Sequence, residues 1–188
     1  MIYGKFIEVT GELAYQLNFI SKTIGNDPQR PTFHNILIEK SEIDEKGLKA
    51  VAVDGKRMHI VDPLAIETDE GLKEGRWRFL KYKPKLRTAW MAEIPHPSYE
   101  FVNYKKAIPT IEPSFIEDFE LGFTGEYYGG ELARVLHFLN SFPEPTVINP
   151  YFLADLGFGT WTVSWYERNK AVVFEKEEYK AIIMPCIT

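Results

Sequence analysis

The side chains that most often perform chemistry are scattered in this sequence. The four histidines, His34, His59, His96 and His137, form no HxxxH or HxH pair, so we predict no metal site. No GxGxxG and no GxxxxGK followed by Ser or Thr occurs, so no phosphate-binding loop is indicated. A single cysteine, Cys186, excludes a disulfide framework, and its strand-like surroundings predict a buried, inert thiol. We therefore expect no catalytic residue, no metal and no cofactor.

One acidic stretch is compatible with an alternative function, that of a metal-dependent enzyme. No cation occurs between Thr110 and Leu132, and the carboxylates there are Glu112, Glu117, Asp118, Glu120, Glu126 and Glu131. Paired carboxylates can hold Mg²⁺ for a nuclease, in which Glu117 and Asp118 would be essential. Their mixed spacing fits a solvated loop and the start of a helix better. The stretch could also contact the basic stretch of a second copy, head to tail.

A basic stretch precedes the acidic one. Between residues 73 and 87 there are seven cations and one acid, with aromatic residues interleaved. Alternating cations put several charges on one face of a strand, where they can neutralise phosphates without reading sequence. An exposed edge strand protected by charge is the alternative. The DNA-binding candidates in this stretch are Arg76, Arg78, Lys81 and Lys83.

The segment LKAVAVDGKRMHIVD (48–62) predicts a hairpin with unusual turn chemistry. Apolar residues alternate on both sides of Asp54 and Gly55, and Asp-Gly strongly favours a tight turn. Two adjacent cations, Lys56 and Arg57, follow at once. They are either solvated or present something to a partner.

Helical and strand patterns alternate along the chain in a way that predicts an α+β fold. We expect a strand at 2–9, a helix from 11 that stops at Gly25, a strand at 32–39 and the hairpin. A second helix is predicted over 130–142. A third begins at Pro150 with Asn149 as N-cap, and strands follow from 160 to the end. Helix followed by antiparallel strands thus occurs twice, at 11–62 and 149–187, which hints at internal duplication.

The composition predicts a globular, cytoplasmic protein. The chain has 188 residues, 45% of them hydrophobic and 14% aromatic, which is enough for a packed core. A formal charge of -5 and a pI near 5.5 argue against coating nucleic acid by net charge alone. The N-terminus lacks the apolar core of a signal peptide and no run of 18 apolar residues exists, so no membrane association is expected.

Several stretches occur in an order that is informative: RPTFHNILIE (30–39), VAVDGKRMHIV (51–61), NYKKAIP (103–109), VINPYFLADL (147–156) and YKAIIMPCIT (179–188). Together they resemble segments of the bacterial sliding clamp, the beta subunit of DNA polymerase III. The second is similar to the family's Ala-Thr-Asp-Gly-His-Arg-Leu-Ala segment. The last is similar to its closing strand, Tyr-x-Val-Val-Met-Pro-Met-Arg-Leu. The resemblance covers roughly a quarter of the chain.

The resemblance implies a DNA-clamp-like α+β fold built from helix-plus-meander units. We expect one elaborated domain over 1–188, with clamp-like halves at 1–66 and 146–188 and an insertion at 67–145. Two abbreviated clamp domains, about 1–108 and 109–188, are the alternative. A chain of this family is about twice as long and surrounds DNA within a ring. This chain would therefore assemble with copies of itself, or act without a ring.

The resemblance also implies a hydrophobic pocket that binds short peptide segments of polymerases and other replication proteins. The matching positions are Gly55, Lys56, Arg57, Met58, Lys106, Ala107, Ile182 and Met184. Methionine and isoleucine would form an adaptable apolar floor, and Arg57 would hold a peptide carbonyl or carboxylate. Lys56 stands where the family usually has histidine, so the peptide preference would differ.

The first helix lines the DNA channel in this family, which adds Lys22 and Arg30 to the DNA-binding candidates. The resulting expectation is a non-enzymatic processivity factor that tethers a DNA polymerase or another replication or repair protein to double-stranded DNA. A peptide-binding adaptor that never surrounds DNA is the alternative within this class.

Overall fold

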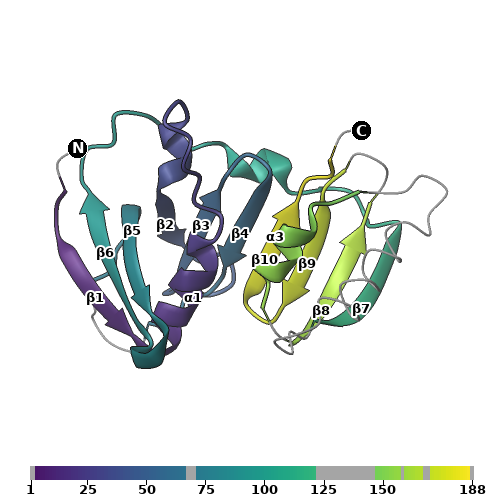
Figure 1. The fold of residues 1–188 in the computed structure, drawn as a ribbon, viewed down its shortest axis with the longest axis horizontal. Coiled ribbons are helices and arrows are strands. Elements are labelled where there is room, and N and C mark those ends of the chain that lie inside the picture. The colour runs from purple at the N-terminus through teal and green to yellow at the C-terminus, as the bar shows by residue number, and fades with distance from the viewer. Residues whose placement is uncertain (1–2, 67–70, 122–146, 158, 167–169, 187–188) are drawn as a thin grey trace. The chain divides into compact units, whose positions relative to one another are not determined.

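The computed structural model describes residues 3–66, 71–121, 147–157, 159–166 and 170–186, and Figure 1 shows their fold. The chain separates into two compact units, Met1–Asn103 and Tyr104–Thr188, and each is described by itself. The helix predicted over 130–142 lies outside the described residues. No helix in the described part of the chain is long and apolar enough to cross a membrane.

The first unit is an antiparallel sheet with the α-helix α1 (Gly11–Ser21) lying across it (Figure 1). The spatial order of its strands is β1-β6-β5-β2-β3-β4, and each pairs with its neighbours antiparallel. Their bounds are β1 (Phe6–Thr10), β2 (Ile36–Lys40), β3 (Leu48–Val53), β4 (Arg57–Val61), β5 (Gly75–Lys83) and β6 (Thr88–Ile94). The predicted helix and hairpin are therefore confirmed.

The strand register shows which sheet face α1 covers. The ring of His59 stacks on Phe19 of α1, and His59 pairs with Ala52 across β3 and β4. Residues paired across strands share a face, and side chains two positions apart along a strand do so too. When these two rules are applied strand by strand, from Ala52 on β3 through β2 to β5, Trp77 falls on the same face as His59. This is the face that α1 covers. Trp77 is fully buried there, together with the α1 residues Leu13, Leu17 and Ile20.

A β-bulge interrupts this alternation in β5. Phe79 pairs with Met91 and Lys81 pairs with Trp90, so Leu80 has no partner in the ladder. Since Met91 and Trp90 are neighbours on β6, their side chains point to opposite faces. Lys81 therefore turns to the face away from α1.

The strand predicted over 32–39 is shorter than expected. Its first part is a 3₁₀ helix, Pro31–His34, and only Ile36–Lys40 joins the sheet as β2. Phe33 explains the difference, because its amide donates to the carbonyl of Arg30 while its carbonyl accepts from the amide of Gly25. These bonds satisfy the backbone locally, so the segment has no need of a strand partner. Helix α1 also ends earlier than predicted, at Ser21, and turn-type bonds follow it.

The second unit is an antiparallel sheet with the spatial order β10-β9-β8-β7. Its strands are β7 (Phe115–Leu121), β8 (Gly159–Trp165), β9 (Val172–Lys176) and β10 (Tyr179–Ile183). A 3₁₀ helix, Tyr104–Ala107, begins the unit, and the short helix α3 (Pro150–Ala154) lies between β7 and β8 in the chain. As predicted, the Asn149 side chain caps α3 by accepting from the amide of Tyr151 at 3.0 Å. The fold class, α+β with helix-plus-antiparallel-strand units, is confirmed.

Candidate functional site

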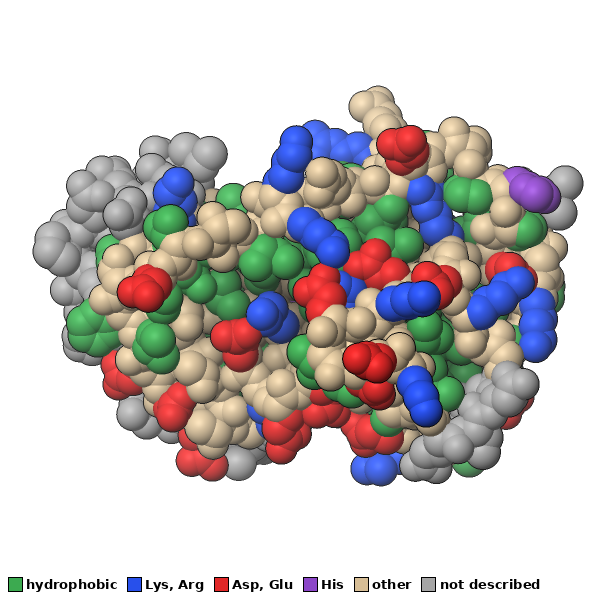
Figure 2. All heavy atoms as spheres, turned by 180° about the vertical axis from the view of Figure 1, so that it is seen from behind, with side chains coloured by type: hydrophobic (Ala, Val, Ile, Leu, Met, Phe, Trp, Pro, Cys, Tyr) green, Lys and Arg blue, Asp and Glu red, His purple; other side chains and the backbone are tan. Residues whose placement is uncertain are grey.

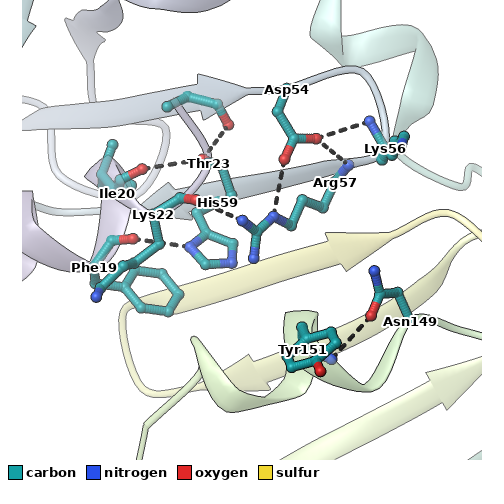
Figure 3. Close-up of polar contacts among 11 residues, drawn as sticks. Phe19, Ile20, Lys22, Thr23, Asp54, Lys56, Arg57, His59, Asn149 and Tyr151 are labelled. Carbon is teal, nitrogen blue, oxygen red and sulfur yellow. Dashed lines mark hydrogen bonds and ion pairs between the residues drawn. The ribbon is translucent and has the colours of Figure 1, made fainter. Parts of the chain in front are cut away.

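In the first unit, the hairpin turn is organised by Asp54. One carboxylate oxygen accepts from the amides of Lys56 and Arg57 at 2.8 and 2.9 Å (Figure 3). Gly55 has a φ of +87°, and a Cβ placed on it would lie 3.2 Å from the ring of Phe33. Both observations require glycine here, for conformational freedom and for space. The predicted Asp-Gly turn thus forms, and its backbone is held by its own aspartate.

Arg57 is held by the protein itself. Its Nε donates to the other carboxylate oxygen of Asp54 at 2.9 Å, and an Nη donates to the carbonyl of Lys22 at 2.6 Å (Figure 3). Its side chain is only 11% exposed. Lys22 is the C-cap of α1, so the guanidinium interacts favourably with the negative end of the helix dipole. Arg57, whose role the sequence left open, therefore joins the hairpin to the end of α1 by hydrogen bonds.

Two further residues, His59 and Thr23, reinforce the same junction. His59 is fully buried, and its Nδ1 lies 2.9 Å from the carbonyl of Phe19, which implies that this nitrogen carries a proton and donates. Burial lowers the pKa of His59 to about 3, so the ring is neutral at physiological pH. The Thr23 hydroxyl lies 3.0 Å from the carbonyls of Ile20 and Ala52. Sequence reasoning missed the bonds of His59 to Phe19 and of Thr23 to Ala52, because each joins segments far apart in the chain.

The two remaining hairpin candidates differ in exposure. Lys56 is exposed, whereas Met58 is 2% exposed and belongs to the buried apolar residues. Of the four hairpin positions named from the sequence, Gly55 and Lys56 are exposed and Arg57 is largely enclosed.

In the second unit, a hollow of about 390 Å³ brings together three of the predicted pocket residues. Lys106 and Ala107 end the 3₁₀ helix, and Met184 follows β10. The rest of the lining was not predicted: Ile108, Pro109, Thr110, Ile111, Tyr166, Lys170 and Ala171. Ile182 is 1% exposed and is not part of the lining.

Local structure fixes the walls of this hollow. Tyr104 is buried and anchors the 3₁₀ helix, whose last turn is closed by the amide of Ile108 donating to the carbonyl of Lys105. Beyond Met184, the amide of Cys186 donates to the carbonyl of Val147 at 2.7 Å, which ties down the chain after β10. Cys186 itself is exposed, so the predicted buried thiol is wrong: β10 ends at Ile183, before the cysteine.

The hollow combines apolar surface with two cations. Ile111 is 53% exposed and Met184 40% exposed, so both offer apolar surface that a ligand can cover. Lys106 and Lys170 are both exposed, and the described lining includes no carboxylate. Burial, together with the charge of Glu175, raises the pKa of the Tyr166 phenol above its usual value although Lys180 opposes the shift. Tyr166 therefore keeps its proton at neutral pH. Such a site can hold apolar side chains and an anionic group.

The DNA-binding candidates divide between two places in the first unit. Arg76, Arg78, Lys81 and Lys83 pair in register with Ile94, Ala92, Trp90 and Thr88, on the sheet face away from α1. Figure 2 looks from behind α1, and there Lys and Arg side chains are interspersed with Asp and Glu.

Some of these cations have contacts within the unit. Arg76 donates to the carbonyl of Tyr99, Arg78 donates to that of His34 at 3.4 Å, and the Lys83 ammonium lies 5.1 Å from the centre of the Trp90 ring. Lys22 caps α1 and is exposed, and Arg30 is an exposed residue paired with Asp27 at 3.7 Å. Four of the six cations thus lie on β5, whereas Lys22 and Arg30 lie at and after the end of α1.

The acidic stretch is described only in part, because Glu126 and Glu131 lie outside the described residues. Glu117, Asp118 and Glu120 lie on β7 and are exposed. Asp118 accepts from the hydroxyl of Thr162 on the neighbouring strand at 2.7 Å. Within the described ranges, no group of three or more His, Cys, Asp or Glu side chains is arranged to hold a metal ion.

No protein-family model and no curated protein matches this sequence. Solved structures do match it. DNA polymerase III subunit beta of Borrelia burgdorferi is 14% identical with a TM-score of 0.62, covering 98% of this chain and 65% of that one. The beta sliding clamp of C. crescentus is 11% identical with a TM-score of 0.63, covering 99% and 66%. A sliding clamp of Bartonella birtlesii bound to griselimycin is 11% identical with a TM-score of 0.59, covering 100% and 68%. The chain therefore has the predicted sliding-clamp fold and spans about two thirds of the length of these clamps.

Proposed function

We propose that this chain is a clamp-like tether without catalytic activity, which holds a DNA polymerase or another replication or repair protein on double-stranded DNA. A short peptide segment of that partner binds the hollow of the second unit. The observation that carries the proposal is the lining of this hollow: Lys106, Ala107 and Met184 were named from the clamp resemblance alone, and all three line one hollow. The sliding-clamp fold of the whole chain supports the same function.

The division into units at Asn103 and Tyr104 supports the two-domain interpretation of the chain. We propose that the chain consists of two abbreviated clamp domains with their boundary in the sequence near this point. In the first of them, the hairpin residues Gly55 to Met58 take part in partner binding through the exposed Lys56 rather than through Arg57. Arg57 is held by Asp54 and by the end of α1.

Selection of peptides on the protein tests the peptide-binding role. We expect the immobilised chain to enrich peptides with apolar side chains from a random library. The substitution Met184→Asp puts a charge beside the apolar lining and should abolish enrichment. Leu86→Asp is the matched control, because Leu86 is also a large apolar side chain, 64% exposed, and lies in the other unit. No enrichment by the unaltered chain, or equal enrichment by both variants, would refute the role.

Self-association of the chain is part of this proposal, and the exposed edge strands of the two units support it. Among the described strands, β1 and β7 each pair with a single neighbour and end their sheets. Phe6 on β1 is 63% exposed, and Phe115 and Ile116 on β7 are 51% and 57% exposed. Edge strands that expose large apolar side chains pair readily with another chain.

Light scattering tests the assembly. We expect a closed homo-oligomer whose mass falls to that of the monomer in Phe6→Lys or Ile116→Lys. A strict monomer at high concentration would refute the homo-oligomeric ring. The alternative function, a peptide-binding adaptor, would then remain. Four of the candidate cations lie on the sheet face away from α1, whereas Lys22 lies at the end of α1, so the two groups are tested separately.

The salt dependence of DNA binding shows which of the candidate cations contact DNA. Each phosphate contact contributes about -0.9 to the slope of log K against log salt on duplex DNA. If Lys22 and Arg30 carry the binding, the slope should be about -2, and Lys22→Glu should abolish it while Lys81→Glu does not. The reverse pattern would place the DNA-binding site on the sheet face away from α1, where Lys81 lies. Mg²⁺-dependent DNA cleavage lost in Glu117→Gln or Asp118→Asn would instead establish the nuclease.

A further inference from the structure

The hollow of the second unit has one feature that peptide binding through apolar contacts does not explain. Its described lining includes two ammonium groups, Lys106 and Lys170, and no carboxylate to balance them. Both lysines are exposed. They come from separate segments, Lys106 from the 3₁₀ helix and Lys170 from the chain just before β9, so the fold and not the local sequence brings them to one site.

We propose that the peptide bound here carries a carboxylate beside its apolar side chains, and that Lys106 and Lys170 bind this carboxylate. The inference rests on the proposed peptide-binding function and adds the charge of the partner. From the sequence, Arg57 was the expected carboxylate ligand. Its guanidinium already donates to Asp54 and to Lys22, so the structure assigns the role to the two lysines.

The chemistry of the neighbouring residues fits such a peptide. Ile111 and Met184 supply exposed apolar surface that a bound side chain would cover, and Met adapts to different shapes. The Tyr166 phenol stays protonated, because burial raises its pKa, and so can donate but carries no charge that would repel a carboxylate. A volume of about 390 Å³ lies at the small end of ligand pockets, which suits a few residues of an extended peptide.

A carboxylate can come from an Asp or Glu side chain or from the C-terminal end of a protein. The experiment distinguishes these sources by displaying random nonapeptides in two formats. One format leaves a free C-terminal carboxylate, and the other continues into the display protein. Enrichment of Asp or Glu in the second format identifies a side chain. Enrichment confined to the first format identifies a chain end.

Charge reversal on the protein provides the decisive variant. Selection on Lys106→Glu/Lys170→Glu should shift enrichment from acidic to basic peptides, since the apolar lining is unchanged. For a fluorescein-labelled acidic peptide chosen by the unaltered chain, anisotropy should report binding weakened about tenfold. The control, Lys40→Glu/Lys46→Glu, makes the same charge change at exposed lysines of the first unit and should alter binding less than about twofold. Because all four lysines are exposed, both double variants should fold, which circular dichroism checks.

The outcomes separate this inference from the function on which it rests. Peptides enriched through Met184 but no richer in carboxylates than the unselected library would overturn the inference and leave the tether intact. Equal weakening by both double variants would also overturn it, because the effect would then come from net charge. The absence of any enriched peptide would refute the proposed function, and the inference with it.

Discussion

The buried imidazole of His59 makes the stability of the protein depend on pH. Its pKa is about 3 in the folded state, because burial opposes the charged form, against about 6.5 in an unfolded chain. Between these values the unfolded state binds more protons than the folded state. Its contribution to stability is therefore complete above pH 6.5 and is lost as the pH falls toward 3.

The size of the effect follows from the two pKa values. Lowering the pH from 7 to 5 protonates nearly every unfolded imidazole and leaves His59 neutral in the fold, which costs about 2 kcal/mol of unfolding free energy. In His59→Phe the ring still stacks on Phe19 but cannot titrate. This variant loses the hydrogen bond to the Phe19 carbonyl, which costs about 1 kcal/mol at every pH.

Urea unfolding followed by circular dichroism at pH 5, 6 and 7 measures the difference. The loss between pH 7 and 5 should be smaller in His59→Phe than in the unaltered protein by about 2 kcal/mol. The other histidines are the same in both proteins, so any contribution from them cancels in the comparison. His59→Asn, which keeps a hydrogen-bond donor, repeats the test if the phenylalanine variant folds poorly. An equal pH dependence in both proteins would refute the reasoning that burial holds His59 neutral.

Three further substitutions test local contacts by urea unfolding at pH 7. Arg57→Ala should lower the unfolding free energy by about 2 kcal/mol, because it removes a largely enclosed ion pair and a bond to the end of α1, and a change below about 0.5 kcal/mol would contradict this structural role. Gly55→Ala should cost about 1–2 kcal/mol through its positive φ and contact with Phe33, and no loss would mean that the turn relaxes freely. Asn149→Ala should cost about 1 kcal/mol by removing the cap of α3, whereas Asn149→Ser should restore most of it.

Sequence reasoning succeeded where the deciding interaction is local. The Asp54–Gly55 turn and the Asn149 cap each depend on contacts within a few residues, and both form as expected. It failed where the partner is distant in the chain. Arg57 pairs with the carbonyl of Lys22, 35 residues away, and no local pattern indicates that bond. Lys170 was missed for the same reason, since its relation to Lys106 exists only in the fold.

The β5 stretch shows how one residue can change the meaning of a pattern. A strict alternation from Arg76 would put even-numbered side chains on one face and turn Lys81 and Lys83 toward the core. The bulge at Leu80 prevents this and keeps all four cations on the sheet face away from α1.

The unpaired Leu80 also has an evolutionary consequence. It is 45% exposed and has no partner in the ladder, so a relative that lacked it would keep every other pair of the strand in register. Loss of a residue elsewhere in β5 would reverse the side chains on one side of the gap. Position 80 is therefore the place in this strand where a single-residue insertion or deletion can persist among homologues, and where an alignment of them should open its gap.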